Sequence, residues 1–155
     1  MELSAFQVSK IELIAEYEAA VMELYWVYSE KFPEHRDFWI DMADDERKNV
    51  EWVRSAIESI KAGKIDYNRD RFNIEAVRTA MNFIKAQIRE TLDKPVTLQA
   101  ALAYATGIED SMTKKRFYEM IKDDNQEARL LHQKFAAENQ RHRDKLSQFR
   151  QKHKS

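Results

Sequence analysis

Hydrophobic residues recur at helical spacing along most of this chain. The first apolar stripe follows intervals of three, four or seven residues, the pattern of one face of an amphipathic helix. It predicts a helix over about residues 5 to 31, which Ser4 and Gln7 open in the form of a capping box. The stripe consists of Ile11, Ile14, Val21, Tyr25, Tyr28 and Phe32.

A second stripe and a shorter third one follow. Pro33 suits the first position of a helix, and the second helix is expected to end near Gly63. The polar segment "KIDYNRDR" then predicts a connection, and apolar residues at helical spacing indicate a shorter amphipathic helix over about residues 73 to 92. The buried sides are expected to carry Trp39, Met42, Val50, Val53, Ile57 and Ile60, and then Ile74, Val77, Met81, Ile84 and Ile88.

The last third of the chain predicts two more long helices. Thr97 marks the start of the first, whose buried side is expected to continue through Met112 and Met120. Asp124, with Glu127 three residues later, is expected to open the second. The pattern therefore predicts an all-α protein, with four long helices in two hairpins joined by a long, partly helical crossover.

Composition agrees with one helical domain over residues 1–155. The chain has only two glycines and two prolines, and 34% of its residues are charged, which favours helices over sheets. A net charge of −1 gives no reason to expect nucleic acid as a partner. No apolar run reaches the roughly 18 residues of a membrane span, and no secretion signal is evident, so we expect no membrane partner and a cytoplasmic location. Without cysteine, a metal would need carboxylate and imidazole ligands.

Polar residues interrupt the apolar stripes near the middle of each long helix. A buried carboxylate loses several kcal/mol of hydration, and several together repel each other. Iron or manganese would neutralise them, because these ions accept carboxylate oxygens and imidazole nitrogens. The ordinary alternative is that each glutamate pairs with a lysine or arginine, or reaches solvent, and that the histidine is satisfied in the core. The interrupting residues are Glu18, Glu46, Asn49, Glu109, Glu138 and His142.

Four segments resemble the ferritin-like superfamily, and specifically the rubrerythrin-type di-iron domain. They read "EYEAAVMELYW", "MADDERKNVEWV", "TLQAALAYATGIEDSMTKKRFYEM" and "FAAENQRHRDKL". The resemblance implies a ferritin-like four-helix bundle that binds two iron ions, or manganese, and reduces dioxygen or peroxide or handles iron. It also implies a homodimer and a separate electron donor, since the cysteines of a rubredoxin module are absent. The implied metal ligands are Glu18, Glu46, Glu109, Glu138 and His142.

The chain departs from the family pattern at two positions. Asn49 stands where the second helix would carry a histidine, so one ion would be held less firmly. On the last helix the Glu138–His142 spacing is four rather than three, which still keeps both residues on one face. In the third helix the ligand position can also be read as Ser111 instead of Glu109. Tyr25 is the candidate catalytic residue, as a hydrogen-bond partner of a ligand carboxylate, although core packing also explains it.

Two other functional interpretations stay open. The chain can be a degenerate ferritin-like bundle, in which Asn49 marks a lost or mononuclear metal site and the fold serves a structural or interaction role. The basic segment "RHRDKLSQFRQKHKS" can also contact an anionic partner, although cations are favourable at the C-terminus of any helix. Sequence does not separate iron from manganese, or an oxidase from a peroxidase.

Overall fold

The computed structural model describes residues 5–68, 73–111 and 119–154, with side chains from residue 9 onward. These residues form an all-helical structure, as the sequence predicts. Within the described ranges the only extended pairing is one isolated bridge. The elements are α1 (Ala5–Lys31), the short 3₁₀ helix η1 (Pro33–His35), α2 (Arg36–Lys61), α3 (Ile74–Asp93), α4 (Leu98–Glu109) and α6 (Gln126–Lys152).

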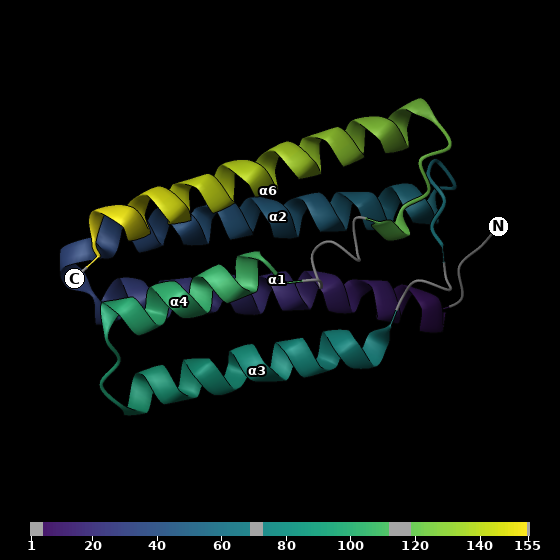
Figure 1. Ribbon diagram of the computed structural model, residues 1–155. Helices are drawn as coiled ribbons and strands as arrows, with labels where there is room; N and C mark the ends of the chain where they lie inside the picture. Colours follow the sequence, from purple (N-terminus) through teal and green to yellow (C-terminus); the bar gives the residue numbers. More distant parts are fainter. Residues whose placement is uncertain (1–4, 69–72, 112–118, 155) are drawn as a thin grey trace.

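The helices lie side by side along one common direction (Figure 1). Helix α1 packs against α2 and α3, while α4 packs against α6, and α2 meets α6. The connecting helix α3 lies on the outside of α1, and Tyr104 of α4 donates a hydrogen bond to the Phe83 carbonyl of α3 at 3.2 Å. Buried side chains of α1, α2, α4 and α6 contact one another in the interior.

Side chains that accept backbone N–H groups begin three of the helices. Asn73 caps α3 and Thr97 caps α4, each by accepting the N–H three residues later at 3.1 Å. Asn125 caps α6 in the same way at 2.9 Å. Such caps satisfy amide groups that have no partner inside the helix. The last helix therefore begins one residue later than the sequence indicates, because Asn125 and not Asp124 supplies the cap.

Helix α4 is shorter than the third long helix that the sequence predicts. It ends at Glu109, and the backbone N–H of Asp110 closes its last turn. Gly107 weakens the helix, and the aspartate and serine that follow Glu109 compete with helical hydrogen bonding. Met112 lies outside the described residues. Met120 is buried, but it follows the break instead of continuing α4.

The connection after α2 is more than a polar linker. Tyr67 is only 6% exposed and forms an antiparallel bridge with Ile121. Next to it, the backbone N–H of Asn68 donates to the carbonyl of Met120 at 2.6 Å. The chain is thus tied together between the end of α2 and the start of α6.

The apolar stripes form the core. Most predicted positions are buried, whereas Phe32, Val50 and Ile74 are half-buried at its margin. Trp39 and Trp52 are buried within the chain, and Trp26 is 46% exposed. No helix in the described ranges combines the length and the apolar character that crossing a bilayer requires.

Candidate metal centre

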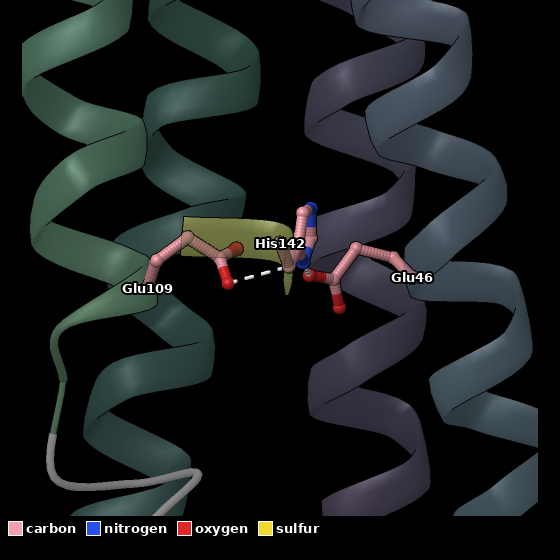
Figure 2. Close-up of side chains that lie close together, drawn as sticks. All are labelled: Glu46, Glu109 and His142. Carbon is pink, nitrogen blue, oxygen red and sulfur yellow. Dashed lines mark ion pairs between the residues drawn. The ribbon is translucent and has the colours of Figure 1, made fainter. Parts of the chain in front are cut away.

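Three of the predicted ligands meet in the interior (Figure 2). Glu46 comes from the middle of α2, Glu109 is the last residue of α4, and His142 lies on α6. One ligand atom of each residue lies within 4.8 Å of the corresponding atoms of the other two. All three side chains are at most 2% exposed. Residues far apart in the sequence therefore form one buried, polar group.

The imidazole ring stands between the two carboxylates. Nδ1 of His142 lies 3.3 Å from Oε1 of Glu46 and 3.2 Å from Oε2 of Glu109. Figure 2 shows the carboxylates approaching the ring from opposite sides. A proton on Nδ1 can be donated to one of these oxygens or shared between the two. Even a protonated imidazole carries only one positive charge, so the three side chains together are negatively charged whenever both glutamates are ionised.

Tyr25 of α1 fixes the position of Glu109. Its hydroxyl donates a hydrogen bond to Oε1 of Glu109 at 2.7 Å, and its ring lies edge-on to His142 with centroids 6.3 Å apart. Burial, followed by the negative charges of Glu109 and Glu46, raises the pKa of Tyr25 well above its ordinary value of 10.0. The hydroxyl therefore remains protonated at neutral pH and stays a donor.

The position of Glu109 at the end of α4 adds a further electrostatic cost. The C-terminus of a helix carries partial negative charge, which disfavours an anionic side chain there. Glu109 is nevertheless buried. A cation at this point would therefore be favoured by two carboxylates and by the negative end of α4 together.

Of the other predicted ligands, two are buried and one is partly exposed. Glu18 is buried on α1, and Asn49 is buried one turn beyond Glu46 on α2. Glu138 is 37% exposed and accepts a hydrogen bond from Arg141 at 3.3 Å. Four residues on an α-helix differ by about 40° around its axis, so α6 turns His142 inward and leaves Glu138 at the rim.

Ser111, the alternative ligand position that the sequence offered in the third helix, is not part of the group. Ser111 follows the end of α4, and its hydroxyl lies 3.4 Å from that of Tyr17. Glu109, not Ser111, belongs to the group formed with Glu46 and His142. The role of these residues as ligands stays a prediction.

A further buried acid, which the sequence did not predict as part of the site, lies beside the group. Asp45 is 4% exposed, and its oxygens are 2.8 Å from Arg141 and 2.7 Å from Lys145. Lys145 also lies 2.7 Å from Asp41. Burial opposes the ionisation of Asp45, but hydrogen bonds from Lys145 and Arg141 hold its pKa below the ordinary 3.8. The sequence contained a signal for this contact. Asp41 and Asp45 are four residues apart on α2, and Arg141 and Lys145 are four residues apart on α6, so each pair lies on one face of its helix.

The donor set suits one divalent ion. Two carboxylates and an imidazole match the preferences of iron and manganese, and two ionised carboxylates balance a charge of +2. Metal–ligand distances of about 2.0–2.2 Å place neighbouring ligand atoms about 3 Å apart. The 3.2 and 3.3 Å separations between His142 and the two carboxylates are close to that spacing. The residues present therefore fit a metal ion.

Comparison with known proteins adds no further assignment. No protein family, curated protein or solved structure matches this chain.

Proposed function

We propose that this chain binds a divalent transition-metal ion, iron or manganese, through Glu46, Glu109 and His142. Its function would be the reduction of dioxygen or peroxide, or the handling of iron, as expected of a rubrerythrin-type protein. The observation that carries the proposal is the convergence of three buried ligand atoms, from three helices, within 4.8 Å of one another.

Electrostatics supports a cation at this point. Burying a carboxylate without an opposite charge costs several kcal/mol, and here two buried carboxylates lie within 3.3 Å of the same imidazole nitrogen. A protonated His142 offsets one negative charge at most. A divalent ion offsets both, and His142 then contributes as a neutral ligand.

The residues of the chain have separate tasks in this function. When bound, iron or manganese supplies one-electron redox chemistry and a position for an oxygen-containing substrate. Glu46, Glu109 and His142 hold the ion, and Tyr25 orients Glu109 through the 2.7 Å hydrogen bond. The buried setting limits access of bulk water. Electrons would come from a separate donor protein.

The finer form of the proposal is a di-metal site in a ferritin-like four-helix bundle, with α3 as the crossover helix. Glu18 and Glu138 would then complete the ligands of a second ion. The second candidate is a bundle with a mononuclear or structural site. It is favoured because Glu138, a ligand that the second ion would need, is 37% exposed and paired with Arg141. Asn49 instead of histidine also weakens a second ion's ligand set.

Metal content tests both forms. Wild-type protein purified aerobically is expected to retain iron or manganese at a ratio of at least one per chain, measured by inductively coupled plasma mass spectrometry. The double variant Glu46→Gln/Glu109→Gln removes both negative charges while preserving size, and it should lose the metal. Glu51→Gln on the exposed side of α2 is the matched control and should keep it.

Glu138→Gln separates the two forms. Loss of one of two ions in this variant supports a di-metal site, whereas one ion per chain that is unaffected supports the mononuclear form. Adding ferrous iron and then air should produce an absorption band of oxidised iron in the wild type. Equal metal content in the wild type and in the Glu46→Gln/Glu109→Gln variant would reject the site.

A further inference from the structure

An open groove lies at the surface between α4 and α6 and extends as far as Glu109. Its volume is about 710 Å³, and Glu109 forms part of its wall. Leu146 is the one aliphatic residue in an otherwise polar lining, so the groove suits a polar molecule better than an apolar one. The lining consists of Thr106, Glu109, Asp110, Gln140, Arg143, Asp144, Leu146, Ser147, Arg150, Gln151 and Lys154.

Three cations belong to the lining of the groove. Arg143 and Arg150 are seven residues apart and therefore share one face of α6, and Lys154 follows just after the end of this helix. Arg150 donates a hydrogen bond to the hydroxyl of Thr106 at 3.2 Å, and Arg143 donates to the side-chain oxygen of Gln140 at 3.2 Å. Both acceptors are neutral. Within the described residues, none of these three cations forms an ion pair.

The neighbouring face of α6 shows the contrast. There Arg141 and Lys145 point to α2 and pair with the carboxylate of Asp45. The same helix thus pairs one set of cations with a buried acid of α2 and presents another set in a groove. Arginine forks recognise carboxylate and phosphate groups through paired, charge-assisted hydrogen bonds.

The acids in the groove restrict the shape of a suitable ligand. Asp110 and Asp144 belong to the same lining as the cations, so a ligand with negative charge over its whole length would be repelled. A molecule with one anionic end and an uncharged, polar remainder avoids this repulsion. Such a molecule can place its anionic end on the arginines and its other end near Glu109.

We infer that the groove between α4 and α6 binds a small organic molecule that carries one carboxylate or phosphate group. Arg143 and Arg150 bind this group, and the remainder of the molecule extends toward Glu109. This makes the ligand a substrate or co-ligand of the metal centre, a role that rests on the proposed function. Binding in the groove itself does not depend on a metal.

The first experiment measures binding to the metal-free protein. Chemical-shift titrations in NMR use 4-hydroxybutyrate as the carboxylate probe and glycerol 3-phosphate as the phosphate probe, with butane-1,4-diol and glycerol as their neutral counterparts. At least one anionic probe should bind, with shifts in the groove residues, and its neutral counterpart should not. Equal shifts from charged and neutral probes, or none from either, would overturn the inference.

A pair of charge-matched variants locates the binding. Arg143→Gln/Arg150→Gln should weaken binding about tenfold or more, since each lost charge-assisted hydrogen bond has a large effect. Arg129→Gln/Lys152→Gln removes the same charge from exposed positions of α6 outside the groove and should change affinity less than about twofold. Equal losses in both variants would show nonspecific attraction and refute the groove. Circular dichroism verifies that each variant is helical.

The second experiment tests the link to the metal centre. Protein loaded with Mn²⁺ and freed of excess ion should broaden the proton signals of the bound probe, since a paramagnetic ion relaxes nearby protons. A probe that binds to the Mn²⁺ protein without broadening would refute the approach to Glu109. If the protein retains no Mn²⁺, the proposed function fails, while the metal-free titrations still decide whether the groove binds anions.

Discussion

Asp45 and Glu46 are adjacent on α2, both almost fully buried, and yet have different surroundings. Asp45 contacts the cationic ends of Arg141 and Lys145. Glu46 instead lies against the imidazole of His142, with the second carboxylate of Glu109 beyond it. Consecutive helical residues differ by about 100° around the axis, so one acid faces the margin between α2 and α6 and the other faces the interior.

The partners of Asp45 and those of Glu46 differ in how much contact with water they keep. Arg141 is 49% exposed and Lys145 is 21% exposed, so these cations keep part of their hydration while they neutralise Asp45. His142 and Glu109 have lost nearly all contact with solvent. Changes in the inner group should therefore cost more than changes at the margin, because water cannot replace a lost partner there.

The largest effect is expected from His142→Ala in metal-free protein. Removing the imidazole leaves two buried carboxylates facing each other, so the free energy of unfolding should fall by about 3–5 kcal/mol at neutral pH. Urea denaturation in the presence of a chelator measures this. Adding Glu46→Gln to His142→Ala should restore part of the loss, as a double-mutant cycle would show. A loss below about 1 kcal/mol would contradict the electrostatic reading of this group.

Tyr25→Phe should have the next largest effect. The variant keeps the ring but deprives Glu109 of its 2.7 Å donor, which should destabilise the protein by about 2 kcal/mol. Affinity for Mn²⁺ should also fall about tenfold, because partners that orient a ligand carboxylate tune metal binding. Calorimetric titration measures the affinity, with Tyr104→Phe as the control at a hydroxyl that contacts α3. Unchanged affinity would show that Tyr25 serves in packing alone.

Asp45→Asn should have a smaller effect on stability and none on metal content. It removes the charge that Arg141 and Lys145 share, but these side chains can regain water, so we expect a loss of about 1–2 kcal/mol. Asp41→Asn is the matched control, since Asp41 also contacts Lys145 but is 58% exposed, and it should cost less than about 0.5 kcal/mol. Loss of the metal in Asp45→Asn would mean that the two regions are not independent.

The smallest effect concerns salt. Raising the NaCl concentration from about 0.1 to 1 M shortens the screening length from about 10 to 3 Å. The stability difference between wild type and Asp45→Asn should then narrow by a few tenths of a kcal/mol. The difference for His142→Ala should stay constant, because its charges are buried. Denaturation curves at both salt concentrations provide the comparison.

Periodicity alone predicted the helices well. The expected helix over residues 5 to 31 coincides with α1, and the expected connecting helix differs from α3 by one residue at each end. Long, regular stripes carry this information because each turn repeats it. The early end of α4 was missed, since a continued stripe through Met112 and Met120 concealed the local effect of Gly107 and the polar residues after Glu109.

The sequence predicted part of the candidate site, because polar residues that interrupt an apolar stripe mark positions on the inner face of a helix. Glu46, Glu109 and His142 each interrupt an apolar stripe, and the structure buries all three. Glu138 interrupts its stripe equally well but accepts a hydrogen bond from Arg141 at the rim. Asp45, which the stripe did not mark, is buried through contacts with α6. Position on a face thus identified candidates, whereas burial depended on the neighbouring helix.

The sequence by itself determined that the chain is helical, where most helices begin, and which faces are apolar, since helical period and capping depend on residues a few positions apart. The tertiary structure alone decided which polar residues meet. A rotation of about 40° separates the inward His142 from the half-exposed Glu138, and only the packing of α6 against its neighbours fixes that rotation.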